Sequence, residues 1–412
     1  MREFHVKDYG AVGDGQTLNT AAIQRTVDAC AAVGGGRVVI GEGTYMSGTI
    51  VLRSNVDLHI EADGVLLGSP DCSDYPERDG VIHVDSYRLP RHRNACFIFA
   101  EECCNVSLSG MGAIDCNGHH FVKKKEGDWE GWEYDRLDLP TPPRVVFFTG
   151  CTNVRITDIT MRNQPSGWSY WIHDCEEVTF DRCKILANVH YPNNDGIHVN
   201  SSRDVTISNC NIVCGDDCII VRANNLSLPE NKVCERVTVT GCNLTSYANC
   251  IRIGWMGDGV IRNCTFSNLV MTDSVNGIGI VLPGIVPGAA DCGREDTLAE
   301  NLLFSNIVMD GIYAHPIKIT LDGPENTRCE ALRNIDFSGI RARGLEFPYL
   351  RGNTDHPIQN IRFSDCAFEK VSDEELPNYK QHGPALWERV VNGLLLQHAE
   401  NVTFHNTTFT VR

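Results

Sequence analysis

The chain has 412 residues, of which 42% are hydrophobic and 22% are charged, so it is long enough for a large buried core. Its net charge of −17 excludes general electrostatic attraction to nucleic acid or to anionic membranes, and no partner of either kind is predicted. No apolar run of about 18 residues is present, so no membrane-spanning segment is expected. The sequence predicts no particular oligomeric state.

The chain begins at Met1 without an apolar signal segment, which predicts a cytoplasmic protein unless a leader has been removed. The 19 cysteines are odd in number and show no fixed paired spacing, so they predict free thiols rather than a disulfide framework. One tight cluster, Cys210, Cys214 and Cys218, has no histidine at ligand spacing. We therefore expect neither a metal nor any other cofactor.

Residues 17–33 are predicted to form one amphipathic helix, with Ala21, Ile23, Val27 and Ala31 on its apolar face. Glycines 34–36 follow it and end the helix. About residues 1–45 are expected to form an N-terminal cap, because the repeats that follow would otherwise leave an open end.

A five-residue phrase recurs along the rest of the chain, and its alternation of apolar and polar residues has the period of a β-strand. Successive copies commonly start 24 to 33 residues apart, a spacing typical of a solenoid with short strands in each turn. Small polar residues flank the strands, which favours an all-β solenoid of the β-helix type over a leucine-rich repeat. The copies begin at Asn105, Asn153, Glu177, Asp204, Arg236, Asn301, Asn334, Asn360 and Asn401.

Cysteines recur late in this phrase and are predicted to form a stack of buried thiols: Cys183, Cys210, Cys242, Cys264 and Cys366. The whole chain, residues 1–412, is predicted to be a single β-helix domain. Its stretch from about 344 to 398 is expected to hold irregular C-terminal insertions.

A second set of strands lies between the first, at residues 195–199, 217–221, 249–253, 276–280 and 315–319, which align without gaps. If each belongs to a successive coil, equivalent positions stack about 4.8 Å apart. The first aligned positions then form an outward polar column: Asp195, Asp217, Asn249, Asn276 and His315. The third positions point inward: Ile197, Ile219, Ile251, Ile278 and Ile317. The fourth form a second outward column: His198, Ile220, Arg252, Gly279 and Lys318.

Asp216 precedes Asp217, so three carboxylates are expected on two adjacent coils. Like charges this close raise the pKa of at least one of them, which lets one carboxyl act as an acid while others act as bases. Glycoside hydrolysis needs such a pairing. A polar ladder that only caps strand ends is the alternative interpretation.

Together with the repeat, three motifs resemble the polygalacturonase family (glycoside hydrolase family 28): residues 8–15, residues 193–196 (Asn-Asn-Asp-Gly) and residues 215–218 (Gly-Asp-Asp-Cys). The resemblance spans roughly residues 5–320. It implies a right-handed, single-stranded parallel β-helix and an inverting glycosidase that acts mainly on pectin. By the same resemblance, Asp216 would be the general acid, Asp195 and Asp217 would hold and deprotonate the attacking water, and Asn193 would help position the site.

Two departures from the family pattern point to a different sugar. The supporting histidine of the family falls on Asn249, and its Arg-Ile-Lys, which grips a galacturonate carboxylate, falls on residues 279–281 (Gly-Ile-Val). We therefore expect a substrate other than plain polygalacturonate, with a neutral or deoxy sugar such as rhamnose in the leaving-group subsite. Arg222 and Arg252 are candidates to restore an anion contact.

Further substrate contacts are predicted on both sides of the aspartates. His198 faces outward with Asp195, and Trp171 and His173 lie one coil earlier. The stretch 117–144 breaks the repeat, and its aromatic residues could form a sugar platform. The complete predicted substrate-binding set is Asn193, His198, Arg222, Asn249, Arg252, Trp171 and His173.

Three classes of function stay open from the sequence. The leading class is an inverting hydrolase of the polygalacturonase type that acts on pectin-derived or related oligosaccharides. The second is a β-helix lyase or glycosyl-transferring enzyme, although most pectate lyases need Ca²⁺ and an Arg or Lys base, and no such cluster accompanies the aspartates. The third is a non-catalytic carbohydrate-binding β-helix. Stacked carboxylates about 5 Å apart would by themselves suggest a retaining mechanism, whereas the family resemblance implies inversion.

Overall fold

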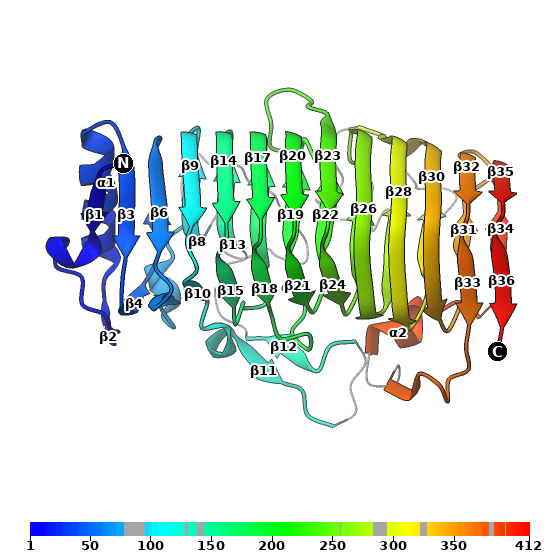
Figure 1. The fold of residues 1–412 in the computed structure, drawn as a ribbon, viewed down its shortest axis with the longest axis horizontal. Helices are drawn as coiled ribbons and strands as arrows, with labels where there is room; N and C mark the ends of the chain where they lie inside the picture. The colour runs from blue at the N-terminus through cyan, green and yellow to red at the C-terminus, as the bar shows by residue number, and fades with distance from the viewer. Residues whose placement is uncertain are drawn as a thin grey trace.

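The computed structural model describes residues 1–77, 95–127, 131–137, 144–255, 257–282, 295–321, 328–378, 383–391 and 393–412. Two long parallel sheets wind along the chain as a β-helix (Figure 1). The coils are right-handed, as connections between parallel strands nearly always are. The predicted all-β class and solenoid architecture are confirmed.

The larger sheet, here called sheet A, makes two of the three sides of each coil. Its first row contains β1 (Glu3–His5), β3 (Gly36–Ile40), β6 (Val56–Ile60), β9 (Cys104–Ser109), β14 (Thr152–Thr157), β17 (Glu176–Asp181), β20 (Arg203–Ser208), β23 (Cys234–Thr240), β32 (Ile358–Ser364) and β35 (Ala399–His405). Its second row contains β2 (Asp14–Leu18), β4 (Gly43–Ser47), β7 (Gly64–Gly68), β10 (Ala113–Asp115), β15 (Thr160–Arg162), β18 (Lys184–Leu186), β21 (Asn211–Cys214), β24 (Asn243–Ser246), β33 (Ala367–Lys370) and β36 (Thr408–Val411). Three long strands run through both rows: β26 (Val260–Ser274), β28 (Thr297–Ile312) and β30 (Cys329–Gly344).

The other large sheet, sheet B, forms the remaining side. It contains β5 (Ile50–Val51), β8 (Cys96–Glu101), β13 (Arg144–Thr149), β16 (Trp168–His173), β19 (Ile197–Asn200), β22 (Ile219–Arg222), β25 (Asn249–Ile253), β27 (Asn276–Leu282), β29 (Ile317–Leu321), β31 (Tyr349–Arg351) and β34 (Leu395–Gln397). A small hairpin of β11 (Val122–Lys124) and β12 (Tyr134–Arg136) lies outside the two large sheets. The short 3-10 helices are η1 (Val6–Tyr9), η2 (Cys72–Asp74) and η3 (Gly118–Phe121).

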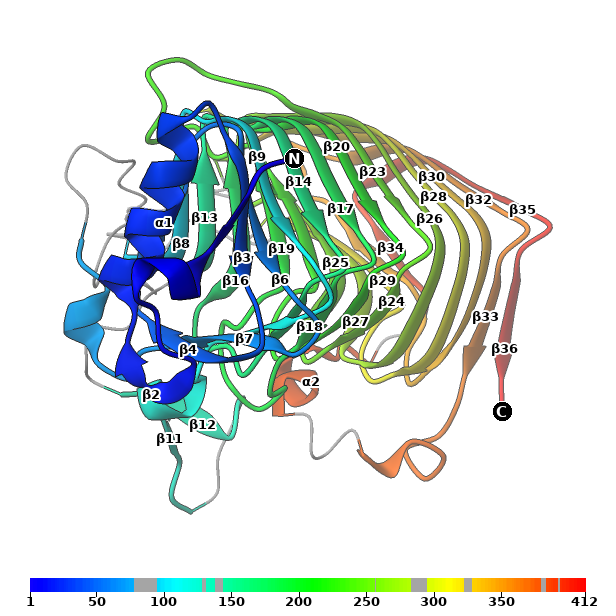
Figure 2. The same ribbon diagram turned by 60° about the vertical axis from the view of Figure 1, so that its left-hand side comes forward.

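The N-terminal helix covers the first coils, as Figure 2 shows. Helix α1 (Thr20–Ala32) starts three residues later than predicted, because the preceding segment is strand β2. The side chain of Asn19 ties down this junction: its Oδ1 accepts from the Val12 amide at 2.7 Å, and its Nδ2 donates to the Thr17 carbonyl. Ile23 and Val27 are fully buried as expected, whereas Ala21 is exposed.

The first residue of each recurring phrase adopts the left-handed conformation, with φ between 53° and 57° at all nine predicted starts. Asparagine tolerates this conformation better than most residues. Several of these asparagines also stack: Nδ2 of Asn360 donates to Oδ1 of Asn334 at 3.0 Å, and Nδ2 of Asn401 donates to Oδ1 of Asn360 at 2.8 Å. The phrase therefore marks a turn and an outer amide ladder as well as a strand.

The predicted register of sheet B is observed throughout the second set of strands. The five isoleucines pair in sequence and are completely buried. His198, Ile220, Arg252, Gly279 and Lys318 pair in the same way as one column. The five predicted core cysteines are buried, and every cysteine that the structure describes is a free thiol.

The C-terminal region is more regular than predicted. Strands β31, β32 and β33 lie within residues 344–398 and continue the coils, because they pair with β29 and β30. The departure from the repeat begins after β33 and includes helix α2 (Gly383–Glu388), on the same side of the solenoid as β11 and β12 (Figures 1 and 2). No described helix has the length and apolar character needed to cross a membrane.

Candidate active site

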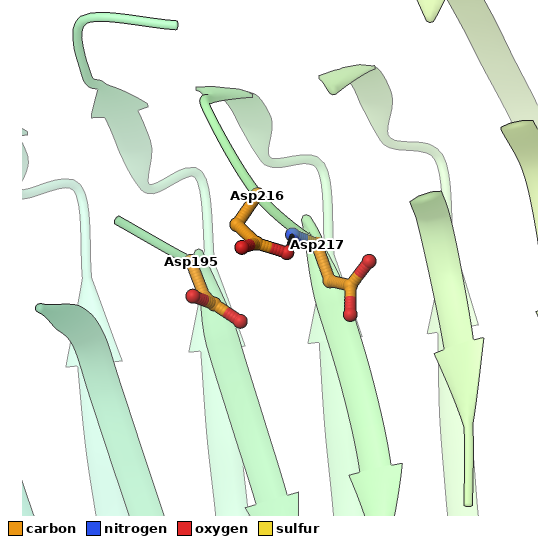
Figure 3. A group of neighbouring side chains, drawn as sticks. All are labelled: Asp195, Asp216 and Asp217. Atoms are coloured by element: carbon orange, nitrogen blue, oxygen red, sulfur yellow. Dashed lines mark hydrogen bonds between the residues drawn. The ribbon is translucent and has the colours of Figure 1, made fainter. Parts of the chain in front are cut away.

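Three carboxylates converge on the turns that lead into two neighbouring strands of sheet B. Asp195 precedes β19, and Asp216 and Asp217 precede β22 (Figure 3). One oxygen atom from each carboxylate lies within 4.8 Å of the other two. Asp195 and Asp217 are buried, with 4% and 8% exposure, whereas Asp216 is partly exposed. The structure therefore brings the predicted trio together and leaves one member accessible to solvent.

Two glycines allow the coils to approach closely enough for this cluster. A Cβ atom on Gly196 would collide with the Cys218 carbonyl, and one on Gly215 would collide with the Tyr191 carbonyl. The Gly215 amide donates to Oδ1 of Asn194 at 2.6 Å, which joins the two turns directly. Close packing of the two turns therefore positions them independently of the carboxylates.

The surroundings of Asp195 disfavour its ionised form. Burial raises the pKa of its carboxyl well above the usual range, and the negative charge of Asp217 raises it further. Nε2 of His198 lies 3.0 Å from Oδ2 of Asp195, and the imidazole stacks on the Trp168 ring with centroids 4.0 Å apart. Burial, with help from the positive charge of Arg222, lowers the pKa of His198 well below its usual value. The lowered pKa favours the neutral form of the imidazole, and the raised pKa makes the ionised carboxylate of Asp195 a stronger base.

Asn249, which replaces the histidine of the family pattern, holds Asp217. Its Nδ2 and its backbone amide both donate to Oδ1 of Asp217, at 2.6 and 3.0 Å. The Oδ1 atom of Asn249 is buried next to Gly279. A Cβ atom on residue 279 would collide with this oxygen, so the glycine makes room for Asn249. The two departures from the family pattern are therefore physically coupled: with Asn249 in this position, an arginine at residue 279 would collide with it.

Asn193 reaches the third carboxylate. Its φ of 54° is left-handed, and its Nδ2 donates to Oδ2 of Asp216 at 3.2 Å. Nη2 of Arg136 donates to Oδ1 of the same amide at 2.6 Å. Arg136 lies on β12 of the 117–144 stretch and was not among the residues predicted from the sequence. The only sequence signal for it was that this stretch interrupts the repeat.

Other residues of the 117–144 stretch contact the same turns. The Trp132 indole donates to the Gly215 carbonyl, and the Tyr134 and Tyr191 rings meet edge to face with centroids 4.8 Å apart. The stretch therefore contributes to the aspartate site, although these two aromatic rings pack against protein. Trp129, which the sequence also offered as a sugar platform, lies outside the described residues.

Two predicted substrate contacts are buried on β16. Trp171 is 2% exposed and stacks on Phe147 with ring centroids 4.8 Å apart. His173 is completely buried at the far end of β16, and its pKa is lowered to about 3 by burial and by the positive charges of Arg144 and Lys232. Both side chains are buried in the described structure, and a role for either residue in substrate binding stays a prediction.

The two predicted arginines differ in their partners. Arg222 makes a two-point ion pair with the buried Asp258, at 3.0 and 2.8 Å, so its charge is already neutralised. Arg252 is 8% exposed and donates to the carbonyl of Val281 at 2.8 Å. Burial lowers the pKa of Arg252, and the nearby negative charge of Asp217 opposes this effect. Arg252 is therefore the predicted cation that remains beside the trio.

The trio is also the one group of potential metal ligands found among the described residues. Three carboxylate oxygens would suit a hard divalent cation such as Mg²⁺ or Ca²⁺. Oδ1 of Asp217 already accepts two hydrogen bonds from Asn249, and Nε2 of His198 lies against Oδ2 of Asp195. The same three carboxylates also suit acid–base chemistry.

A family model described as "Glycosyl hydrolases family 28" matches residues 80–380, most of the chain, including all three aspartates. The chain belongs to this family. It is accordingly a glycosidase that hydrolyses O-glycosyl bonds. A second model, "Rhamnogalacturonase A/epimerase, pectate lyase-like", matches residues 4–109 and includes none of the predicted site residues.

Individual relatives of this family 28 enzyme agree with the assignment. A "Probable polygalacturonase" of Vitis vinifera is 29% identical over 288 residues, which cover 66% of this chain and 55% of the relative. The chain thus matches only about half the length of that protein. An "Exopolygalacturonase" of Platanus acerifolia is 26% identical and covers 93% of this chain and 92% of its own. The crystal structure of an exopolygalacturonase from Thermotoga maritima has the same fold, with a TM-score of 0.72 at 21% identity, over 90% of this chain and 87% of that one.

Proposed function

We propose that this enzyme hydrolyses pectin-related oligosaccharides by a single displacement in which the three aspartates divide the proton transfers. The observation that carries the proposal is the convergence of three carboxylates within 4.8 Å, two of them buried and one open to solvent. The pectin-related substrate is supported by the polygalacturonase names of the relatives.

Each aspartate has a position that suits one task. Asp216, the accessible member, would protonate the glycosidic oxygen as the sugar leaves. The attacking water would lie against Asp195 and Asp217 and lose its proton to them. Oδ1 of Asp195 is a buried oxygen without a hydrogen-bond partner in the described structure, so a bound water would satisfy it. His198 lies against Oδ2 of Asp195, and Asn249 donates to Oδ1 of Asp217.

The short distance between the carboxylates bears on the stereochemistry. Retaining glycosidases place their two carboxyl groups about 5–5.5 Å apart, and inverting ones about 6.5–9.5 Å apart. The oxygens of the trio fall below both ranges, so spacing alone would favour retention. We propose inversion, because Asp195 and Asp217 are both buried and each is held by its own neighbour, whereas Asp216 is partly exposed.

Inversion predicts that the first product released carries the anomeric configuration opposite to that of the cleaved bond. An NMR time course of the product anomers during the first minutes of hydrolysis measures this directly. A first product of unchanged configuration would overturn the single-displacement mechanism and leave hydrolysis itself intact.

The leaving-group subsite has few cations available for a uronate. Gly279 and Val281 occupy the positions of the family arginine and lysine. Lys318, further along the same column as Gly279, forms an ion pair with Glu388, and Arg222 is paired with Asp258. We therefore propose a neutral or deoxy sugar such as rhamnose at this subsite. Arg252 is the residue that could instead serve an acidic sugar.

A substrate panel tests this specificity. We expect release of reducing sugar from rhamnogalacturonan to exceed release from polygalacturonan by about tenfold or more, which corresponds to about 1.4 kcal/mol in transition-state binding. An oligosaccharide with rhamnose on the leaving-group side of the scissile bond measures the subsite directly, and ultraviolet absorbance of unsaturated products identifies lyase chemistry. Preference for plain polygalacturonan would overturn the proposed subsite, and unsaturated products would overturn hydrolysis.

A further inference from the structure

The hairpin formed by β11 and β12 contacts the turn that carries Asn193 and Asp195. The Tyr134 amide donates to the His190 carbonyl at 3.2 Å, so the hairpin follows the turn with its backbone as well as with its side chains. Since the hairpin lies outside the two large sheets, its contacts with the turn are additional to the strand pairing within the coil.

Arg136 makes the most extensive contact of this hairpin with the aspartate site. Its Nε donates to Oγ of Ser166 at 2.8 Å, and its Nη2 donates to Oδ1 of Asn193 at 2.6 Å. Ser166 is completely buried and donates in turn to the Pro192 carbonyl. The planar guanidinium thus holds two consecutive residues of the turn, Pro192 through Ser166 and Asn193 directly.

The bond to Asn193 determines which end of its amide faces Asp216. Because Arg136 can only donate, it fixes Oδ1 of Asn193 on its own side. Nδ2 must then point to Asp216, where it donates to Oδ2 at 3.2 Å. Without the arginine, the amide could turn over and present its oxygen to the carboxylate.

We propose that Arg136 is a positioning residue of the glycosidase, which acts through Asn193 to orient the carboxyl group of Asp216 toward the leaving oxygen. The inference rests on the proposed role of Asp216. The proposal gives the 117–144 stretch a role in positioning catalytic groups, in addition to covering the surface of the solenoid. The charge of Arg136 adds a second effect, because it acts to lower the pKa of Asp195 against the larger effects of burial and of Asp217.

Two replacements separate orientation from charge. Arg136→Lys keeps the charge but loses the two-point geometry, so we expect kcat to fall roughly 10- to 100-fold with the pH profile in place. Arg136→Gln also removes the charge, so the acid limb of the kcat/KM profile should move to higher pH, because Asp195 then ionises less readily. Both are measured with rhamnogalacturonan and polygalacturonan as probes, together with the Tm of each variant.

The coupling to Asn193 gives the sharpest test. If Arg136 acts through this amide, Arg136→Lys should reduce kcat in the wild-type background and cause little further loss in Asn193→Ala. Arg182→Lys is the matched control, because Arg182 also makes two bonds to one partner, at 2.7 and 3.1 Å, but to the partly exposed Asp158 between β14 and β15, in addition to its ion pair with Asp181. It should leave kcat unchanged.

The outcomes distinguish failure of the positioning role of Arg136 from failure of the proposed function. An active wild type with unchanged kcat in Arg136→Lys, or equal losses in both backgrounds, would overturn the positioning role alone. A wild type that hydrolyses neither probe would overturn the proposed substrate class. A fall in Tm with kcat and pH profile preserved well below that Tm would show that Arg136 serves stability only, and would also overturn the inference.

Discussion

Replacement of Asp216 by asparagine is expected to lower kcat by roughly 100- to 10,000-fold while substrate binding is retained. Asparagine has nearly the shape of aspartate and can still accept the hydrogen bond that the Asp217 amide donates to Oδ1 at 3.0 Å. It has no proton to give to the leaving oxygen. Reducing-sugar release measures the loss, and calorimetric titration of Asp216→Asn with the intact oligosaccharide measures the retained binding.

The control is Asp204→Asn, which removes an exposed carboxylate that pairs with Arg236 on the surface of sheet A. It should hydrolyse as fast as the wild type. Unchanged turnover in Asp216→Asn would contradict the assignment of the general acid. Binding without turnover in the wild type as well would favour the non-catalytic carbohydrate-binding β-helix.

The arrangement of the aspartates could be predicted because it follows from periodicity. Once the isoleucines of the second set of strands are aligned, the register of sheet B places Asp195 and Asp217 at equivalent positions on adjacent coils. Strand spacing then brings their side chains together without any knowledge of side-chain packing. One copy of the phrase was nevertheless missed, although Asn263 has the same left-handed φ of 55° and its neighbour Cys264 had already been placed in the thiol stack.

The residues that tune the site could not be predicted in this way. Arg136 reaches Asn193 across 57 positions in the sequence, and Glu388 reaches Lys318 across 70. Both come from segments that interrupt the repeat, where no period relates one residue to another. The bond between Arg222 and Asp258 likewise depends on where a loop returns to the sheet, so the sequence showed a free arginine where the structure has a neutralised one.

The replacement of Asp195 by asparagine should abolish most turnover and, near neutral pH, stabilise the fold. An unfolded aspartate ionises near 3.8, whereas the folded Asp195 holds its proton to a much higher pH. Between these two values the folded state binds more protons than the unfolded state, so the free energy of unfolding of the wild type falls as pH rises. Asparagine does not ionise and does not suffer this loss.

Thermal unfolding of the two proteins at about pH 5 and about pH 8 measures the effect. The Tm of Asp195→Asn should exceed that of the wild type by a few degrees, and the difference should grow with pH while kcat falls roughly 100- to 10,000-fold. Asp204→Asn is again the matched control, because Arg236 lowers the pKa of Asp204 and the sign reverses: removal of this carboxylate leaves stability unchanged or slightly lower.

A Tm difference that shrinks as pH rises would contradict the raised pKa of Asp195. A difference that grows would show that burying this carboxyl beside Asp217 costs stability, as expected where a fold maintains a destabilised site for its chemistry. Loss of turnover together with a gain in stability is the combination that a strand-capping polar ladder cannot produce, because removing a stabilising cap would lower the Tm.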